Sequence, residues 1–395
     1  MRVLITDSGY ISGTLAAARS LHAAGWTVGV GLPRGRGFVS RSRAVARSHT
    51  VPSPEYDLDG FVRGLDNAIR DGGYEVILPS GDLEMLALSQ ERDRINARVP
   101  YGPHEDVVRA LDKLDSTEAA AAAGLKVPWT RLADAEGLAT IDDDREVIVK
   151  ARRHTFLDRG EGTLFKVATV CRGPAEAAAR ARLIASEGGQ GVVQERVNGR
   201  LVALSLVTDR GSRVVAHHYQ VAERCWPEPV GGMARGFTAV VDVDLVARAE
   251  ALLAELRWSG LAQLQFLLGP DDVPYFIDLN GRIYGSIALA IGSGIDLPSV
   301  WASVATERPP LGSGEARPGV RYQWFEADLK RAILGGPRSL PSAMRDAFAY
   351  SRGATHSVWS PKDPLPAIVY SGQLTRRLLL KSVTKEPPAG GSPPS

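Results

Sequence analysis

Short apolar runs alternate with amphipathic stretches along the first part of the chain. The runs that predict buried strands are Val3–Ile5, Thr27–Gly31 and Val76–Pro79. The stretches that predict helices are Thr14–Ala24, Leu58–Arg70 and Asp82–Ser89. Strands that alternate with helices form parallel sheets covered on both faces, so an α/β domain with a parallel sheet is expected. The first turn reads GYISG rather than GxGxxG, and no acidic residue closes the second strand, so a dinucleotide site is poorly supported.

The pattern changes after Pro128, where strands begin to dominate. The predicted strands are Val147–Lys150, Thr163–Val167, Gly191–Arg196, Leu201–Thr208, Arg213–Gln220 and Phe237–Val241. The helices predicted between them are Pro174–Glu187 and Asp242–Leu256. This is an α+β pattern, and its contrast with the first part predicts a domain boundary near Pro128.

A further hairpin is predicted where Leu261–Leu268 and Tyr275–Leu279 flank the turn Gly269–Asp272. Side chains alternate along a strand, so Asp278 and Asn280 are expected to point to the same face of the hairpin. The alternative interpretation of this stretch is a strand that ends in a solvated Asn-Gly turn.

Other polar side chains extend this face. Arg282 joins it if the extended geometry continues, and Gln263 and Gln265 share one face of the partner strand. If that face is the Asp278 face, Gln265 lies near the carboxylate. A carboxylate, an amide oxygen and a guanidinium suit a hard, oxygen-ligated cation beside a phosphate or a carboxylate.

Two lysines stand beside predicted elements. Lys113 lies in LDKLDST, just before the capping box Asp115–Glu118 of a helix predicted to run through Ala123, and taken alone it is an ordinary solvated loop lysine. Lys150 ends a predicted strand. The basic residues that follow it are Arg152, Arg153 and Arg159. Such a cluster suits phosphates, with the loop Asp158–Gly162 closing over them, whereas a lone lysine here would have a surface role.

Another strand is predicted to close with Gln194, Glu195, Arg196 and Val197, before the turn Asn198-Gly199. A strand end of this kind can offer a backbone carbonyl and an N–H to a purine edge, although by itself it is only a hairpin signal.

The last part of the chain, beyond Pro309, predicts weaker helices near Phe325–Leu334 and Ser342–Tyr350, and the closing PPAGGSPPS is expected to be disordered. The 395 residues carry a formal net charge of +2, which gives no reason to expect nucleic-acid binding. Cys171 and Cys225 are the only cysteines, so no disulfide framework or Cys-rich metal site is implied. No signal peptide and no membrane-spanning run is apparent, so a cytoplasmic protein with no membrane partner is expected.

The motifs become specific when their order is considered. After the Rossmann-like start come a DK before a helix that ends in AAGLKVP, a strand that ends in IVK, then QERVNG and FIDLNGR. This series resembles the ATP-grasp superfamily, and most closely its carboxylate–amine ligase-like branch. The resemblance covers roughly Arg2 to Ala305.

The resemblance implies a fold and a division of the chain. It implies an N-terminal Rossmann-like parallel-sheet domain at 1–112 and an ATP-grasp domain at 113–308. The latter would consist of a small central α+β lid at about 128–194 and an antiparallel-sheet α+β ATP-binding subdomain at about 195–308. A helical extension at 309–384 and a disordered tail at 385–395 would follow.

The resemblance also implies site residues. Lys113 and Lys150 match the two lysines that contact ATP, with Lys150 on the α- and β-phosphates. The linker that reads adenine through its main chain matches Gln194, Glu195, Arg196 and Val197. The groups that hold Mg²⁺, or Mn²⁺ in its place, match Asp278 and Asn280, with Gln265 as a weaker neutral ligand. Arg282 matches the arginine that steadies the transferred phosphoryl group.

The sequence departs from the family pattern at several of these positions. Gln265 stands where an acidic residue is usual, Leu201 where many members have a ribose-binding Glu, and Gly281 where a proline is usual. The glutamine puts the number of bound metal ions and the turnover in doubt.

The implied activity is an ATP-dependent ligase that activates a small-molecule carboxylate as an acyl phosphate and joins it to an amine. One alternative is an ATP-binding module that has lost catalysis, supported by Gln265 alone. Another is a nicotinamide-dependent oxidoreductase, which rests on the first βαβ units alone. Candidates for substrate selection are Arg224, Trp226 and a turn at Gly231-Gly232, although a packed Trp and a plain turn are simpler. The sequence does not indicate the oligomeric state.

Overall fold

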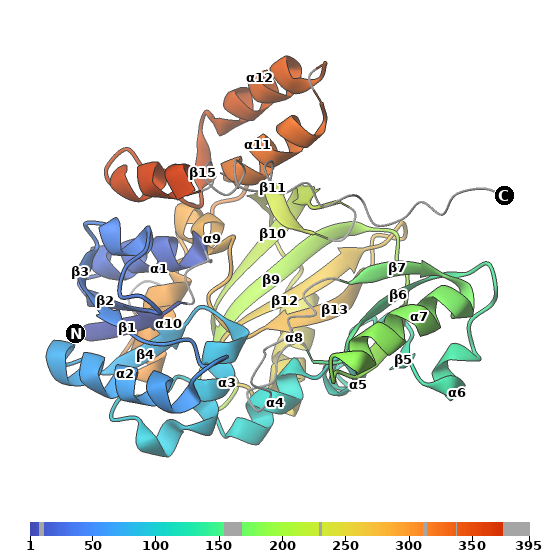
Figure 1. The fold of residues 1–395 in the computed structure, drawn as a ribbon, viewed down its shortest axis with the longest axis horizontal. Helices are drawn as coiled ribbons and strands as arrows, with labels where there is room; N and C mark the ends of the chain where they lie inside the picture. The colour runs from blue at the N-terminus through green and yellow to red at the C-terminus, as the bar shows by residue number, and fades with distance from the viewer. Residues whose placement is uncertain (8–11, 154–167, 229–230, 311–313, 337, 374–395) are drawn as a thin grey trace.

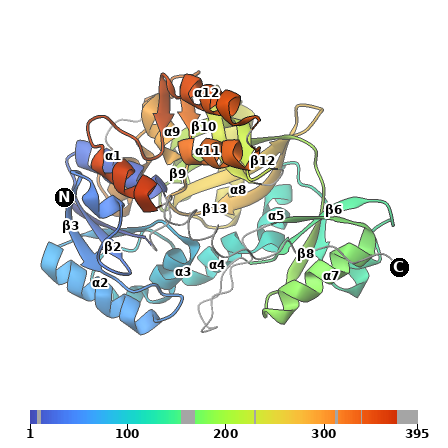
Figure 2. The ribbon, with the colours of Figure 1, turned by 45° about the horizontal axis from the view of Figure 1, so that its top comes forward.

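The computed structural model describes residues 1–7, 12–153, 168–228, 231–310, 314–336 and 338–373. Three β-sheets organise this part of the chain (Figure 1): one four-stranded sheet in the N-terminal region, a second four-stranded sheet and a seven-stranded sheet. We call them the first sheet, the small sheet and the large sheet. Figure 2 shows the small sheet with its helix standing to one side of the other two.

The first sheet is parallel throughout, in the order β3-β2-β1-β4. Its strands are β1 (Arg2–Thr6), β2 (Thr27–Leu32), β3 (Val45–Thr50) and β4 (Val76–Pro79). The helices that alternate with them are α1 (Ser12–Ala23), α2 (Leu58–Gly72) and α3 (Asp82–Gln90). The predicted α/β pattern is therefore confirmed, whereas β3 was not predicted, because its sequence VARSHT has few apolar residues.

Local signals explain both ends of α2. The side chain of Asp57 caps α2 by accepting a hydrogen bond from the Gly60 N–H at 2.7 Å. The same helix ends at Gly73, whose φ of +63° is a left-handed conformation that favours glycine.

Two helices connect the first sheet to the small sheet, α4 (His104–Leu111) and α5 (Lys113–Ala122). The N-cap of α5 is Asp112, whose carboxylate accepts from the N–H groups of Leu114 and Asp115. The predicted capping box at Asp115–Glu118 is therefore wrong by one turn, because Asp112 already supplies the cap. Consequently Lys113 is a buried helical residue and not a solvated loop lysine.

The small sheet has the order β5-β8-β6-β7, with antiparallel pairs. Its elements are β5 (Thr130–Leu132), α6 (Ala135–Leu138), β6 (Glu146–Ala151), β7 (Thr169–Arg172), α7 (Gly173–Ser186) and β8 (Gly191–Glu195). Its apolar core is separate and contains Ile141, Val147, Val149, Ile184 and Val193. The predicted strand Thr163–Val167, Arg159 and the loop Asp158–Gly162 lie outside the described residues.

The large sheet has the order β13-β12-β9-β10-β11-β14-β15. Its strands are β9 (Arg200–Thr208), β10 (Val214–Trp226), β11 (Gly232–Thr238), β12 (Gly260–Leu268), β13 (Pro274–Asn280), β14 (Arg321–Gln323) and β15 (Ala354–His356). The helices of this part are α8 (Val243–Glu255), α9 (Ile287–Ser293), α10 (Leu297–Ala305), α11 (Phe325–Leu334) and α12 (Leu340–Ser351).

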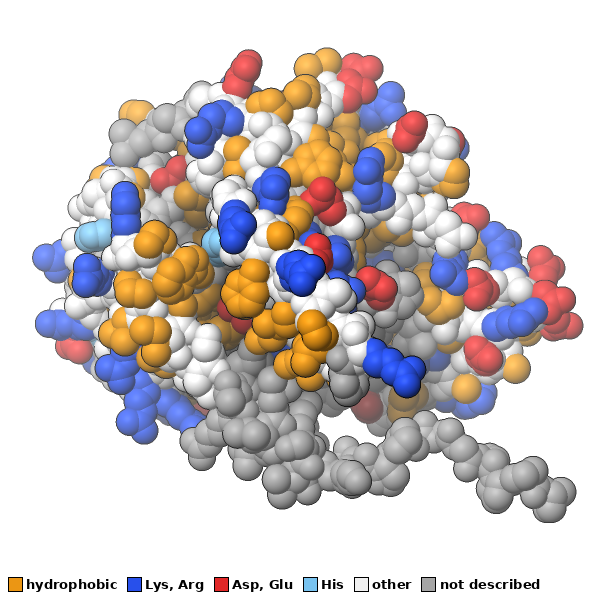
Figure 3. Space-filling view, turned by 90° about the horizontal axis from the view of Figure 1, so that it is seen from above, with side chains coloured by type: hydrophobic (Ala, Val, Ile, Leu, Met, Phe, Trp, Pro, Cys, Tyr) orange, Lys and Arg blue, Asp and Glu red, His pale blue; other side chains and the backbone are white. Residues whose placement is uncertain are grey.

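The C-terminal residues extend the large sheet. Beyond residue 309 the two predicted helices are present as α11 and α12, and β14 and β15 add two strands next to β11. Several large apolar side chains here remain exposed, among them Leu334 and Ile368. Figure 3, a view of the molecule from above, shows apolar and charged side chains interspersed on that face.

One apolar core joins the first sheet to the large sheet. Its members include Leu15, Leu78, Trp258, Phe276 and Trp301, which come from both parts of the chain. Within the described residues no single helix is long and apolar enough to cross a membrane, although the pair α9 and α10, bent by 99°, passes that test by length and composition.

Candidate active site

Three charged side chains from distant parts of the chain meet between the small sheet and the large sheet. The Lys113 ammonium, at the start of α5, forms an ion pair with the Asp278 carboxylate on β13. The Lys150 amine, on β6, donates to the carbonyl oxygen of Ile277 at 3.0 Å. Both lysines therefore lie beside the same strand of the large sheet.

The small sheet fixes the position of Lys150. In the antiparallel pairing of β6 with β8, Lys150 lies opposite Val192 and Ile148 lies opposite Gln194. Lys150 and Gln194 are therefore diagonal neighbours on the same face, and the Lys150 amine donates to Gln194 Oε1 at 3.0 Å. The Gln194 amide nitrogen donates to Thr130 Oγ1 at 2.8 Å, which holds its oxygen toward the lysine.

Lys150 is held in an environment that disfavours its charge. The residue is 8 % exposed, and its amine contacts neutral oxygens. Burial, and then the charge of Lys113, lower its pKa to about 7, whereas Asp278 acts in the opposite direction. An anion placed against this amine would restore its charge, so the geometry suits a phosphate group.

The predicted hairpin is present, and its register brings amide oxygens beside the carboxylate. Gln265 is paired with Asp278, and Gln263 with Asn280, across β12 and β13. These side chains share one face, as expected if the two polar faces coincide. A carboxylate and amide oxygens are ligands that Mg²⁺ accepts.

These oxygen atoms fit a metal ion only together with the phosphates of a bound nucleotide. Asp278 is engaged by Lys113, and Asn280 Oδ1 accepts from Arg282 Nη2 at 3.0 Å. In the described part of the chain no group of three His, Cys, Asp or Glu side chains is arranged to hold a metal ion. The oxygen donors fit a divalent cation that also binds phosphate oxygens. They carry too little negative charge to bind the cation tightly without the phosphates.

Arg282 lies in the turn that follows β13 and contacts α3, the helix after the last strand of the first sheet. Its Nε donates to Asp82 Oδ1 at 3.1 Å, and Asp82 is the first residue of α3. Asp82 was not singled out from the sequence. The signal was its position just beyond the carboxyl end of β4, after Ser80 and Gly81, because ligands of open α/β sheets bind at that edge.

The strand end predicted to read adenine lies next to Lys150. β8 ends at Glu195, so the main chain leaves the sheet at Arg196 and Val197. The side chains of the first two of these residues are engaged locally: Glu195 faces Arg145 at 3.3 Å, and Arg196 forms an ion pair with Glu146. The Glu195 N–H already donates to the Trp129 carbonyl oxygen at 2.7 Å, so the main chain that this strand end offers to a ligand is that of Arg196 and Val197.

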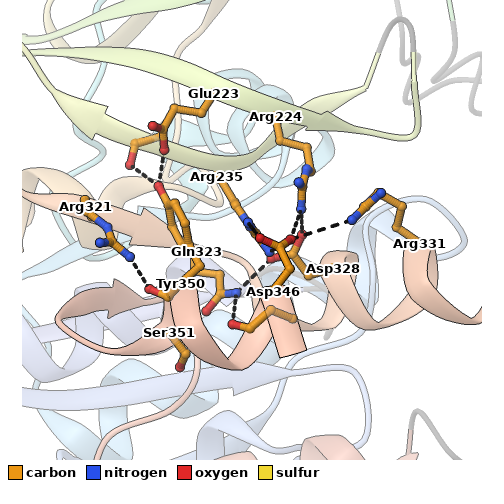
Figure 4. A network of polar contacts seen from close by, with 12 residues as sticks. Glu223, Arg224, Arg235, Arg321, Gln323, Asp328, Arg331, Asp346, Tyr350 and Ser351 are labelled. Carbon is orange, nitrogen blue, oxygen red and sulfur yellow. Dashed lines mark hydrogen bonds and ion pairs between the residues drawn. The ribbon is translucent and has the colours of Figure 1, made fainter. Parts of the chain in front are cut away.

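A second charged cluster joins the large sheet to the C-terminal helices (Figure 4). Arg224 and Arg235, on β10 and β11, form ion pairs with Asp328 at 2.7 and 2.5 Å, and both also reach Asp346 of α12. We call these four residues the C-terminal cluster. Arg224, a candidate for substrate selection, is therefore occupied by two carboxylates, and the predicted turn at Gly231-Gly232 is wrong at Gly232, which begins β11.

Comparison with known proteins gives the fold. No family model matches the chain, and no curated protein matches it in sequence. An L-amino acid ligase from Bacillus licheniformis superposes with a TM-score of 0.60 at 15% identity, over 81% of this chain and 78% of that one. An N5-carboxyaminoimidazole ribonucleotide synthetase in complex with ADP superposes with a TM-score of 0.62 at 12% identity, over 85% and 84%.

A third solved structure is similar to the same extent. The biotin carboxylase domain of 2-oxoglutarate carboxylase from Hydrogenobacter thermophilus, in complex with MgADP and bicarbonate, has a TM-score of 0.60 at 13% identity, over 81% of this chain and 73% of that one. At such identities these likenesses show a shared fold.

Proposed function

We propose that this chain, which has the ATP-grasp fold, is an ATP-dependent ligase that forms a carbon–nitrogen bond and releases ADP. The observation that carries the proposal is the meeting of Lys113, Lys150 and Asp278 between two sheets. A buried amine whose contacts are neutral oxygens suits an anionic ligand, and the similar structures include an ADP complex, an MgADP complex and a ligase.

Each lysine has a role in binding ATP. Lys150 would pair with the α- and β-phosphates, which would restore its charge in a buried position. Lys113 would exchange the Asp278 carboxylate for a phosphate oxygen. The main chain from Gln194 through Glu195 and Arg196 to Val197 would meet the adenine edge, because the strand ends there.

The groups that would hold Mg²⁺, or Mn²⁺, are the Asp278 carboxylate and the amide oxygens of Asn280 and Gln265. The cation would supply positive charge between the phosphates. For the protein, the consequence is that Asp278 becomes available when Lys113 turns to the nucleotide.

The reaction follows from positioning and charge neutralisation, since phosphoryl transfer needs little covalent help from a protein. An oxygen of the substrate carboxylate attacks the γ-phosphorus, the bond to the bridging oxygen breaks, and ADP leaves. Arg282 would steady the phosphoryl group during transfer. The amine then attacks the acyl carbon, phosphate leaves, and the nitrogen loses a proton to give the amide.

The experiment that tests this function measures ADP release from magnesium-ATP against pooled amino acids and small carboxylic acids, with mass spectrometry of the products. The expected result is ADP release that depends on both a carboxylate and an amine, together with a new amide mass. The product should be absent with Lys150→Met. ATP binding without ADP release in any pool would contradict the ligase assignment.

A second candidate function is an ATP-binding protein that has lost catalysis and acts on a partner. It is favoured by one observation, the neutral Gln265 beside Asp278. The same experiment separates the two candidates, because this one predicts nucleotide binding without turnover.

A further inference from the structure

The turn that carries Arg282 is held in place by the first domain. The Ile283 N–H donates to the carbonyl oxygen of Pro79, at the end of β4, at 3.2 Å. The hydroxyl of Tyr101, which is buried, donates to the carbonyl oxygen of Gly281 at 2.6 Å. These bonds fix the backbone on both sides of Arg282 relative to the first sheet.

Close packing reinforces this placement. A Cβ atom at Gly281 would lie 2.3 Å from the ring of Trp258, so only glycine allows the turn to approach the indole. A Cβ atom at Gly13 of α1 would lie 2.1 Å from the carbonyl oxygen of Tyr284. The turn therefore has little room to move between the two domains.

The guanidinium of Arg282 is itself held on three sides. Its Nε donates to Asp82 Oδ1 at 3.1 Å, Nη2 to Asn280 Oδ1 at 3.0 Å and Nη1 to the carbonyl oxygen of Ile283 at 3.4 Å. A guanidinium has five N–H groups, so one remains on each terminal nitrogen. The Arg282 and Asp82 side chains are 18% and 19% exposed, which makes this a partly buried pair and not a surface contact.

We propose that Asp82 is a positioning residue for the ligase reaction: it holds Arg282 so that the two remaining N–H groups face the transferred phosphoryl group. This inference rests on the proposed function. Asp82 is suited to the role because it opens α3 directly after the buried strand β4, so its carboxylate sits on a rigid element. Asp82 is the one carboxylate among the three partners, and it lies on α3, next to the first sheet, whereas Asn280 lies on β13 of the large sheet.

The benefit of this arrangement is preorganisation. A free arginine side chain has many rotamers, and a ligand that fixes one of them has to overcome the lost side-chain entropy. Fixing the guanidinium beforehand removes that cost and leaves its donors aimed at one place. Asp82 contacts none of the residues predicted to bind adenine. It would nevertheless control, through Arg282, the group that acts on the γ-phosphate.

The experiment compares the affinities of magnesium-AMP-PNP and magnesium-ADP by isothermal titration calorimetry. Wild-type protein should prefer AMP-PNP, because Arg282 meets the γ-phosphate. Arg282→Ala and Asp82→Ala should each reduce that preference by about tenfold, with little change in ADP affinity. The double variant should lose no more than either single variant, since both changes remove the same interaction.

Three further variants separate positioning from folding. Asp82→Asn keeps an oxygen that accepts from Arg282 Nε, so it should retain most of the preference. Asp82→Ser places a residue that is favourable at the start of a helix, but its side chain is too short to reach Arg282. This variant replaces Asp82→Ala in the experiment if Asp82→Ala does not fold. Asp244→Ala removes an exposed acid from the first turn of α8 and should leave the preference unchanged.

The outcomes are distinguishable. If Arg282→Ala loses the preference and Asp82→Ala keeps it, or if the two losses add in the double variant, the positioning role is overturned while the proposed function stands. If the wild-type protein binds neither nucleotide, the proposed function fails and the inference fails with it.

Discussion

The molecule contains two clusters of basic side chains and carboxylates, and they differ in how the charges are matched. In the C-terminal cluster, Arg224 and Arg235 both pair with the buried Asp328 and both also reach Asp346. At the candidate active site, Lys113 pairs with Asp278, whereas Lys150 contacts only neutral oxygens among its hydrogen-bond partners within the described residues. The sequence alone does not distinguish the two clusters, because in both the basic and acidic residues are scattered along the chain.

The difference shows how a structural cluster is told from a binding site. Buried charges that are matched within the chain tie elements together, here α11 and α12 to the large sheet. A buried amine whose hydrogen-bond partners are neutral is stabilised in its charged form when an anion binds beside it. The predictions that follow test this contrast.

The largest expected effect is on stability, at the C-terminal cluster. Asp328→Ala leaves the buried Arg235 and the neighbouring Arg224 without their shared carboxylate, so the free energy of unfolding should fall by about 3–5 kcal/mol. Urea denaturation measures it. Asp144→Ala, which breaks an exposed pair with Arg172, should change it by less than about 1 kcal/mol. Equal effects of the two variants would contradict the contrast.

The next effect is on function, at the active site. Lys150→Met should lower ATP turnover by about 100-fold or more, because it removes a charge that faces the phosphates. The melting temperature should change little, because the loss of two hydrogen bonds to neutral oxygens is offset by the removal of a buried amine. The exposed Lys126→Met serves as the matched control. A large loss of stability without loss of turnover would make Lys150 structural.

A smaller effect concerns pH. Burial and the neighbouring Lys113 lower the pKa of Lys150 to about 7, and a bound triphosphate would raise it again. Nucleotide affinity should therefore be nearly constant below pH 7 and fall by up to about tenfold for each pH unit above it, with proton uptake on binding. Calorimetry in buffers of different ionisation enthalpy measures the uptake. Affinity that stays flat from pH 6 to pH 9 would mean that Lys150 does not meet the phosphates.

The smallest effect concerns the metal. Gln265→Glu places a second carboxylate opposite Asp278 and should tighten Mn²⁺ binding in the presence of ADP by about tenfold. Without metal the like charges repel, so the variant should be slightly less stable. Electron paramagnetic resonance of free Mn²⁺ measures the binding. Unchanged affinity would place Gln265 outside the metal shell.

Much of the fold could be predicted where apolar periodicity was clear. The hairpin of β12 and β13, including the face shared by Gln265 and Asp278, followed from alternation along the strands. β3 could not be found this way, because it is an edge strand whose residues are mostly exposed or half-buried. The short β14 and β15 were missed because three residues carry no period.

The candidate site was predictable only in part, and for a similar reason. The pairing of Lys113 with Asp278 spans 165 positions, so only the order of motifs in a resemblance could bring the two together. Asp82 carries no motif of its own. Its relation to Arg282 arises from the packing of the first sheet and α3 against the large sheet, which no local pattern encodes.

The small sheet has an apolar core of its own, whereas the first and large sheets share one. The contacts from Lys150 to Ile277 and from Arg152 to Asp112 that join it to its neighbours are polar. A calorimetric scan of the free protein should therefore show two melting steps, the small sheet melting apart from the remainder. A nucleotide bound to residues of both sheets would merge these steps into one, so the shape of the melting curve would itself report nucleotide binding between the sheets.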